Sequence, residues 1–344
     1  MDLPSTRYYG SKRRIVEKIW MALLEEHIEF DSFLDLFGGT GIVSYLMLKK
    51  EKKVYYNDVL RFNCLNAKAL LATPKNTFTS YDAQSILVPV AGDIYEHIIA
   101  RNFQGIYFKD EENQIIDIAI QNILRLDDKL QCCGYYVLSQ TCLVKRPYNI
   151  FHRNNLYLRL NHTVSRFGNY ITWEKSFQTL FNQFTNELNH YQFDTNKDIT
   201  ISNNSALNCN QKADVVYIDP PYFCESSSIS YHARYHFLEG LANYNLIEQK
   251  IDWQKKNKEI QINKNKEFEQ KSTFLQQISQ LFDQHRQSII VMSYTSNGYP
   301  SIEDLVCLLS QFKRQVIVKS LGHIAFAMNR NNTNREEVLI IGIN

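Results

Sequence analysis

Four consecutive residues, Asp219-Pro220-Pro221-Tyr222, directly follow an apolar run at 215–218 that has the composition of a buried strand. Two prolines in series cannot continue a strand or enter a helix interior, so the chain must leave the sheet in a stiff, extended loop. In a doubly wound α/β sheet, ligands bind at this carboxyl edge of the strands. The sequence therefore predicts a ligand-facing loop that carries a carboxylate and an aromatic ring.

The predicted loop suits the methylation of an amine on a base. The exocyclic nitrogen of adenine is a poor nucleophile because its lone pair is delocalised into the ring. The Asp219 carboxylate and the Pro220 carbonyl can accept hydrogen bonds from that amino group and stabilise the positive charge that develops on it. Tyr222, extended by Phe223, can stack on a base flipped out of a duplex. The alternative is a plain turn with a buried tyrosine, because short motifs also occur by chance.

A second candidate site is the glycine-rich sequence Asp-Leu-Phe-Gly-Gly-Thr-Gly at residues 35–41. Such a loop, between an expected strand and an expected helix, lets a nucleoside cofactor approach the backbone closely. Asp58 lies 17 residues after Gly41, where an acid can bind ribose hydroxyls. A nicotinamide dehydrogenase would use the same geometry, but Ser44 stands where the dinucleotide fingerprint requires its third glycine. A tight turn without a ligand is the remaining alternative.

Residues 7–12, Arg-Tyr-Tyr-Gly-Ser-Lys, form a third candidate site. Here Tyr8 can pack on an adenine ring and Lys12 can pair with a carboxylate. Taken alone, a Tyr-Tyr-Gly sequence before a helix is more often ordinary packing than a binding site.

These motifs require a sheet that brings them together, and the hydrophobic pattern predicts one. Ser11 precedes a helical pattern at 15–24, and a strand at 30–37, a helix at 42–49 and a strand at 54–56 follow. We therefore expect a doubly wound mixed α/β sheet, formed by residues 1–60 and 198–344 and interrupted by a mostly helical insertion at 61–197. Further strands are expected at Ile199–Ser202, Val215–Ile218, Ser288–Met292, Gln315–Lys319 and Val338–Ile343, and a solvated helix or mobile lobe at 248–271.

Composition narrows the class of protein without identifying it. The chain has 344 residues, a net charge of +2 and seven cysteines, with no Cys-x-x-Cys pair. An odd cysteine count without metal-ligand spacing argues against a disulfide framework and a metal site, and favours a reducing compartment. The N-terminus lacks a signal-peptide core, and no apolar run approaches the ~18 residues of a membrane span. We expect a cytoplasmic protein without a bound metal.

The insertion contains a basic stretch that lacks acidic residues altogether. No Asp or Glu occurs from Leu130 to Trp173, while Lys, Arg, Asn and aromatic residues alternate there. Basic side chains can neutralise phosphates, and Asn or Arg can read base edges. A solvated basic face with ordinary aromatic packing is the alternative. We expect DNA contacts at Lys145, Arg146, Tyr148, Asn149, His152, Arg153, Asn154 and Asn155.

Taken together and in this order, the motifs resemble those of the alpha-group DNA adenine-N6 methyltransferases, the Dam-like family of restriction–modification systems and phages. The resemblance implies S-adenosylmethionine as cofactor and double-stranded DNA as substrate, with a protein that acts as a monomer. It leaves open a cognate restriction endonuclease that acts separately. It implies catalysis at Asp219, Pro220 and Tyr222. The cofactor contacts that we expect from it are Tyr8, Lys12, Asp35, Phe37, Gly38, Gly39, Gly41, Asp58, Ser205 and Asp219.

Two details of the resemblance bear on the substrate and the cofactor. Cytosine-modifying relatives usually carry Ser in place of Asp219, and RNA-modifying relatives often carry Asn, so adenine in DNA is favoured. Relatives often place an acid in the segment that corresponds to 201–207, where this chain offers only Asn and Ser. Three other interpretations remain open: methylation of RNA adenine, methylation of the cytosine amine, or a catalytically silent DNA-binding module of the same fold.

Overall fold

The computed structural model describes residues 2–161, 170–221, 223, 230–262, 267–323 and 336–344. Within them, seven strands form one mixed sheet in the order β3-β2-β1-β4-β5-β7-β6. The first five strands of this order run parallel, and β7 is antiparallel to both of its neighbours. The strands are β1 (Ser32–Asp35), β2 (Lys53–Asn57), β3 (Ile199–Ser202), β4 (Val215–Ile218), β5 (Ile289–Thr295), β6 (Gln315–His323) and β7 (Glu336–Ile343).

The strand order reverses beside β1, where a doubly wound sheet opens its ligand crevice. From β1 the chain proceeds outward to β2 and β3, and then returns to β4 on the other side of β1. In the register of these strands, Asp35 lies beside Tyr56 of β2 and Tyr217 of β4. The loops that follow β1, β2 and β4 therefore leave the sheet at the same edge. This arrangement confirms the expected doubly wound α/β fold.

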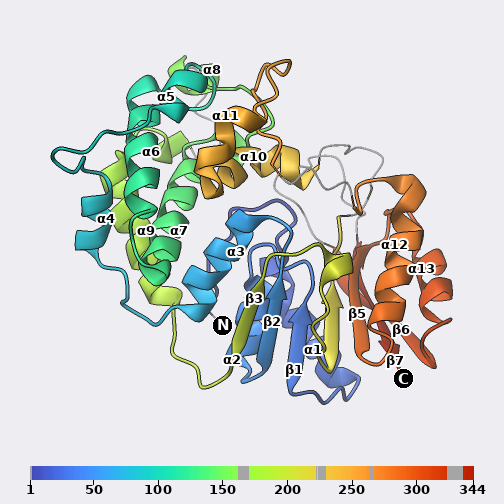
Figure 1. The fold of residues 1–344 in the computed structure, drawn as a ribbon. Helices are drawn as coiled ribbons and strands as arrows, with labels where there is room; N and C mark the ends of the chain where they lie inside the picture. Colours follow the sequence, from blue (N-terminus) through green and yellow to red (C-terminus); the bar gives the residue numbers. More distant parts are fainter. Residues whose placement is uncertain (1, 162–169, 222, 224–229, 263–266, 324–335) are drawn as a thin grey trace.

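Alternate side chains of the central strands enter two separate apolar cores, one on each face of the sheet. Phe33 and Tyr217 pack into the core that contains α1 (Val16–Glu25) and α2 (Ile42–Lys49). Leu34 and Val216 pack into the second core, with α12 (Lys271–Gln284) and α13 (Ile302–Leu309). The two-residue period of a strand requires this division. The result is a three-layer arrangement of helix, sheet and helix (Figure 1).

A second, helical part adjoins the β3 side of the sheet (Figure 1). It is formed largely by residues between β2 and β3, but two helices that follow β4 also pack there: Phe237 of α10 lies edge-to-face on Phe103, with 5.4 Å between ring centroids. Within the described residues no helix has the length and apolarity to cross a lipid bilayer. The helices here are α3 (Arg61–Ala67), α4 (Ser80–Ile86), α5 (Ile98–Asn102), α6 (Asp110–Ile123), α7 (Asp128–Val144), α8 (Tyr157–Leu160), α9 (Phe177–Tyr191), α10 (Tyr231–Ala242) and α11 (Ile247–Lys250).

Several single turns of helix complete the described elements. Ser11 caps the first of them by accepting a hydrogen bond from the Arg13 amide. The prediction that Ser11 caps the helix at 15–24 was wrong, because this turn comes first and α1 has Ile15 as its N-cap, without a side-chain hydrogen bond. The 3-10 turns are η1 (Lys12–Arg14), η3 (Pro147–Asn149), η4 (Tyr170–Thr172), η5 (Ala206–Asn208) and η6 (Tyr244–Leu246), and η2 (Lys68–Ala72) is a π-helical turn.

The segment expected as a solvated helix or mobile lobe at 248–271 has a different structure in its described residues, 248–262 and 267–271, and residues 263–266 lie outside them. Helix α11 ends at Lys250, and Ile251 then forms an antiparallel backbone bridge with Ile260. Asp252 N donates to Glu259 O at 2.8 Å, and the side chains of Ile251 and Ile260 are buried. We call residues 251–260 the hairpin. The prediction of a helix was wrong because apolar residues at both ends of a polar stretch close it onto the helical part.

Candidate active site

The glycine loop after β1 has the close backbone packing that a nucleoside site requires. A Cβ atom on Gly38 would lie 2.1 Å from the Tyr56 ring, so only glycine fits there. Gly39 and Gly41 have φ angles of +51° and +71°, which disfavour other residues. Tyr56 also donates from its hydroxyl to Gly39 O at 2.8 Å. The second strand therefore holds the loop that follows the first.

Asp58 follows β2 and faces the glycine loop. Its Oδ2 accepts a hydrogen bond from Gly39 N at 2.8 Å, and its Oδ1 accepts one from Leu60 N at 2.8 Å. Burial raises the pKa of Asp58 to about 6, against the lowering effect of these hydrogen bonds. The Asn63 side chain also hydrogen-bonds to this carboxylate. Because a carboxylate offers about four lone-pair sites, it retains capacity for a ribose hydroxyl.

Asp35 lies deeper in the sheet than the sequence suggests. It is 1% exposed, and its Oδ2 accepts a hydrogen bond from Ser44 Oγ at 2.7 Å. Burial raises the pKa of Asp35 to about 7. The carboxyl group thus joins the end of β1 to the first turn of α2 and shapes the glycine loop from beneath.

The Asp-Pro-Pro-Tyr loop begins where β4 ends, with Asp219 partly exposed and Pro220 buried. Lys12 Nζ lies 2.9 Å from Asp219 Oδ1 and 3.5 Å from Glu337 Oε2. Both Lys12 and Glu337 are buried. The structure thus brings the first and third candidate motifs into direct contact. Tyr222 lies outside the described residues.

Tyr8 is part of an aromatic stack between the N-terminal segment and α10. Its ring lies parallel to that of Tyr235, with 4.4 Å between centroids and 7° between planes. Tyr231 stacks on it at 5.6 Å, and Asn63 Nδ2 donates to the Tyr8 hydroxyl at 3.3 Å. Tyr235 also accepts a hydrogen bond from Tyr9 N at 2.7 Å. The stack fixes the N-terminal segment that carries Lys12.

Sequence reasoning missed an acidic residue beside Ser205. The Ser205 hydroxyl donates a hydrogen bond to Oε2 of Glu267, and the next residue, Phe268, packs edge-to-face on Phe37 at 5.1 Å. An acid is therefore present beside the 201–207 segment after all, supplied by a part of the chain 62 residues away. Only the fold reveals this proximity, because no local sequence pattern links the two positions.

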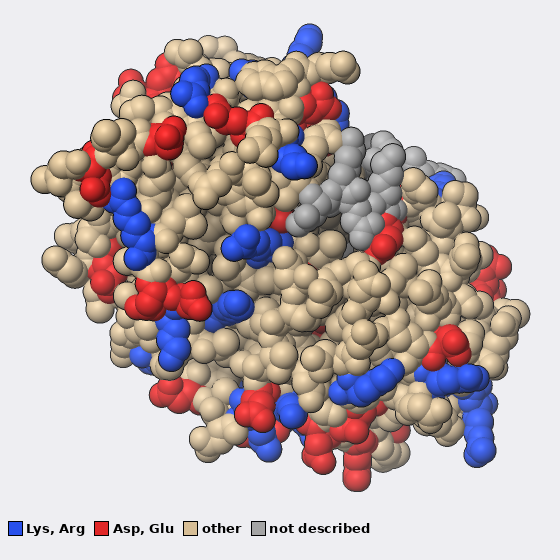
Figure 2. Space-filling view, in the orientation of Figure 1, with Lys and Arg blue, Asp and Glu red and all other residues tan. Residues whose placement is uncertain are grey.

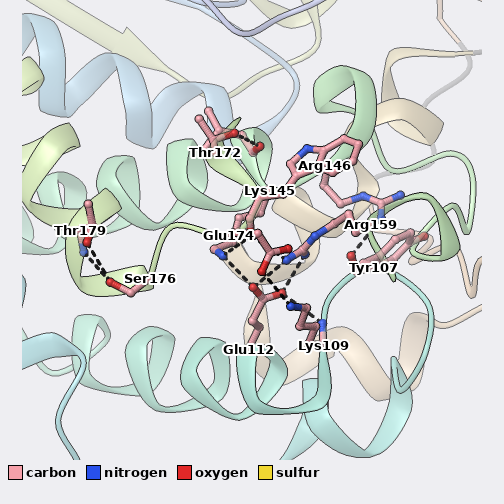
Figure 3. Close-up of polar contacts among 12 residues, drawn as sticks. Tyr107, Lys109, Glu112, Lys145, Arg146, Arg159, Thr172, Glu174, Ser176 and Thr179 are labelled. Atoms are coloured by element: carbon pink, nitrogen blue, oxygen red, sulfur yellow. Dashed lines mark hydrogen bonds and ion pairs between the residues drawn. The ribbon is translucent and has the colours of Figure 1, made fainter. Parts of the chain in front are cut away.

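The basic stretch predicted to contact DNA divides into buried and exposed side chains. Lys145 is 2% exposed and donates to Glu112 Oε1 at 2.7 Å and to Trp173 O at 3.0 Å. Arg159 binds both oxygens of the same carboxylate, each at 2.8 Å (Figure 3). Burial raises the pKa of Glu112, but the hydrogen bonds and charges of Arg159 and Lys145 outweigh this effect and lower it.

Arg146 has no exposed surface and organises the loop that follows it. It donates to Tyr107 O at 3.0 Å, to Arg153 O at 2.7 Å and to Asn155 Oδ1. Burial lowers the pKa of Arg146 to about 9. The expectation of DNA contact through Lys145, Arg146 and Asn155 is corrected here, because their buried side chains hold the helical part together.

The other five residues expected to contact DNA remain on the surface. Tyr148, Arg153 and Asn154 are exposed, and Asn149 and His152 are half-buried. Figure 2 shows Lys and Arg interspersed with Asp and Glu over one face of the molecule. Electrostatic attraction of a polyanion on this face must therefore come from local clusters rather than from a uniform field.

The fold and the site together define a class. A glycine loop, an acid after β2 and the Asp219-Pro220-Pro221 segment after β4 meet at one edge of a doubly wound sheet, which is the arrangement expected of an α/β enzyme with a nucleoside cofactor. More specifically, residues 8–280 match the model of the D12 class N6 adenine-specific DNA methyltransferases. The chain belongs to this family and is an adenine-specific DNA methyltransferase, which implies S-adenosylmethionine as methyl donor.

Individual relatives are similar to this chain over most of its length. The chain is 23% identical to the Type II methyltransferase M2.HphI of Haemophilus parahaemolyticus, over 98% of this chain and 96% of that protein. It is 22% identical to the Type II methyltransferase M.CviAII of Paramecium bursaria Chlorella virus 1, over 96% of both. It is 26% identical to the modification methylase StsI of Streptococcus sanguinis over 96% of this chain, which spans half of that protein.

Proposed function

We propose that this chain is the modification enzyme of a restriction–modification system. In this proposal it methylates N6 of an adenine flipped out of a specific site in double-stranded DNA, acts as a monomer, and a cognate endonuclease acts separately. The observation that carries the catalytic proposal is the contact between Lys12 and Asp219 at the end of β4, beside the glycine loop. The names of the type II relatives support the context.

The residues around the glycine loop fit a nucleoside methyl donor. Gly38, Gly39 and Gly41 permit close approach to the backbone, and Asp58 offers carboxylate lone pairs for ribose hydroxyls. Phe37 supplies apolar surface, the edge of the Tyr8 ring lies 3.8 Å from the position of a Cβ atom on Gly39, and Asp35 holds the start of α2 through Ser44. When bound there, the donor supplies an electrophilic methyl group. Lys12, beside Asp219, adds a positive charge that suits the carboxylate of the donor's methionyl part.

We assign the adenine end of the donor to Ser205 and Glu267. A carboxylate in this position can accept hydrogen bonds from an exocyclic amine, and the Ser205 hydroxyl orients it. Glu267→Gln keeps the shape but replaces an acceptor oxygen with a donor. The variant is expected to bind the donor about tenfold more weakly, because it loses one charge-assisted hydrogen bond and ~1.4 kcal/mol corresponds to a factor of ten in Kd. Equal donor affinity in Glu267→Gln and wild type, measured by calorimetry, would refute this assignment.

Catalysis in this proposal requires two acceptors at the target amine. Asp219 and the Pro220 carbonyl accept hydrogen bonds from the two N–H groups and draw the nitrogen lone pair out of the ring. As the carbon–nitrogen bond forms and the carbon–sulfur bond breaks, the nitrogen gains positive charge, which the Asp219 carboxylate stabilises. The excess proton then leaves the amine to solvent. Tyr222, proposed on the resemblance alone, stacks on the flipped base.

We assign DNA contact to the surface residues of the loop after α7. The exposed Arg153 can pair with a phosphate, while the side-chain amides of Asn149 and Asn154 can form hydrogen bonds with base edges. Tyr148 is 47% exposed and His152 half-buried, so both can contact a backbone or a base. We further propose that residues 61–197 form the target-recognition unit. Helices α10 and α11 pack against this unit.

The decisive experiment uses S-adenosylmethionine labelled in the methyl group. The protein is incubated with unmethylated genomic DNA, in parallel with Asp219→Ala and with total RNA as a second substrate. Nucleosides are then separated after digestion. We expect label in N6-methyladenine of DNA with the wild-type chain and at least about 10²-fold less with the variant. Label in RNA or in cytosine, or none despite donor binding, would overturn the proposal.

A further inference from the structure

Two segments that are distant in the sequence line a single hollow on the helical part. The hollow has a volume of about 260 Å³, and one wall comes from the loop at 152–157. The other wall comes from Lys256 and Asn257 at the tip of the hairpin. In Figure 1 the hairpin lies beside α10 and α11, at the top of the view.

A buried polar network holds these two segments in a fixed relationship. The Tyr107 hydroxyl lies 2.6 Å from Asn257 O of the hairpin and 2.9 Å from His236 Nε2. His236 Nδ1 accepts a hydrogen bond from Ile260 N at 3.0 Å, and burial lowers the pKa of His236 to about 3. A neutral imidazole that accepts at Nδ1 must carry its proton on Nε2. His236 Nε2 is therefore a donor that faces both the Tyr107 hydroxyl and Phe151 O, and the Tyr107 hydroxyl donates toward Asn257 O and Phe151 O.

The same network also holds the other wall. His236 Nε2 and the Tyr107 hydroxyl lie 3.2 Å and 2.8 Å from Phe151 O, and Phe151 N donates to Arg234 O at 2.8 Å. Arg146 donates to Arg153 O, as described above. Buried hydrogen-bond networks of this kind fix backbone positions. The network therefore fixes both walls relative to each other, although 99 to 105 positions separate their residues in the chain.

The exposed groups around the hollow have the chemistry of a DNA-contacting surface. Arg153 and Lys256 are exposed on opposite walls, and Asn154 and Asn257 add amides. The two acids of the hairpin are engaged within it: Glu259 is buried and accepts from Lys255 at 2.8 Å, and Asp252 accepts from Gln261 at 2.9 Å. The three lysines of the hairpin outnumber its two acids, so it keeps a net charge of +1.

We propose that the hairpin is a second DNA-contacting element, which joins the 152–157 loop in one composite recognition surface. Lys256 contacts a phosphate, and the half-buried Asn257, whose Nδ2 donates to Phe151 O at 3.4 Å, holds the tip of the hairpin beside the loop. The inference rests on the proposed DNA contacts of the 152–157 loop. It gives the polar segment after α11 a role in target recognition, in addition to its packing.

The test compares Lys256→Glu and Lys256→Ala with Lys197→Glu, which makes the same charge change at an exposed lysine outside this surface. Binding to a fluorescent 40-base-pair duplex is measured by anisotropy at several salt concentrations. We expect Lys256→Glu to raise Kd about tenfold at low salt and to reduce the slope of log Kd against log salt by about one. Lys256→Ala should have an intermediate effect, and donor affinity and Tm should stay at wild-type values.

The inference fails if Lys256→Glu binds the duplex within twofold of the wild type or no more weakly than Lys197→Glu. Incorporation of label by the wild-type chain separates this failure from that of the proposed function. If the wild-type chain methylates adenine in DNA while Lys256→Glu behaves as the control does, only the role of the hairpin is refuted. If the wild-type chain methylates no DNA, the proposed function itself is refuted.

Discussion

The Lys12 ammonium lies 2.9 Å from Asp219 Oδ1, although 207 positions separate the two residues in the chain. A buried lysine that faces a loop carboxylate restricts the rotation of that carboxylate. Glu337, buried on β7, lies 3.5 Å from the same ammonium. The Lys12 ammonium therefore joins the N-terminal segment to β7 and to the catalytic loop. It orients the Asp219 carboxylate, which is proposed to accept the adenine N–H.

Replacing Lys12 by Met should reduce kcat more than it alters duplex binding. The side chain keeps its length but loses the charge, so Asp219 is no longer held at its position. A displacement of about 1 Å in a catalytic group can cost on the order of 10²-fold in rate. Single-turnover methylation of DNA measures the effect, and donor affinity is measured separately because the methionyl carboxylate also faces this site in our proposal. Lys12→Arg, which keeps a charge, should recover part of the rate. A wild-type kcat in Lys12→Met would contradict the positioning role.

The donor should bind more tightly as the pH rises from 5 to 7. Burial raises the pKa of Asp58 to about 6 in the free protein, so this carboxyl is largely protonated at pH 5 and ionised at pH 7. Only the ionised form offers all of its lone pairs to ribose hydroxyls, so bound donor favours proton release. Calorimetry with the non-reactive product S-adenosylhomocysteine should therefore show a falling Kd across this range. Asp58→Asn should bind it weakly and with a flat pH profile in the same window; an unchanged slope would assign the titration to another group.

The central strands and the candidate site were predictable because their signals are local. The apolar run at 215–218 has the same bounds as β4 in the structure. The glycine loop and the two prolines mark where strands must end. Glu267 could not be predicted beside Ser205, since the contact depends on how the chain returns to the sheet. Lys145 and Arg146 seemed to be surface residues because charged side chains are seldom buried unless they are paired. Their partners, Glu112 and backbone carbonyls such as Tyr107 O, become neighbours only when the helices pack.

Glu112 should be important for the stability of the helical part rather than for DNA chemistry. Glu112→Gln removes the charge that Lys145 and Arg159 share and leaves two buried cations without a counter-charge (Figure 3). The free energy of unfolding should fall by about 3 to 5 kcal/mol, measured by urea denaturation at pH 7.

The same substitution should have a smaller effect at low pH. Because the pKa of Glu112 is lower in the folded protein than in the unfolded chain, its contribution to stability is fully present above the unfolded-state pKa and is lost as the pH falls through the folded-state pKa. The difference between wild type and Glu112→Gln should therefore shrink in acid. Glu174→Gln, at an exposed ion pair with Lys109, is the matched control and should change stability by less than about 1 kcal/mol.

Arg146 and Arg153 are seven residues apart and should respond to substitution in opposite ways. The Arg153 side chain is exposed, and only its backbone carbonyl accepts from Arg146, so Arg153→Glu leaves the fold intact. The Arg153→Glu variant should bind the duplex with a Kd about tenfold higher and a shallower salt dependence, and its Tm should stay unchanged.

Arg146→Ala instead leaves a cavity and deprives buried carbonyls of their donor, which costs about 1 to 3 kcal/mol for each group left unsatisfied. It should lower Tm by several degrees, because about 1 kcal/mol corresponds to roughly 2 to 4 °C in a domain of this size. Thermal scans and anisotropy on the same two preparations separate the cases: a stable Arg146→Ala that loses only DNA binding would mean that this arginine reaches the duplex after all.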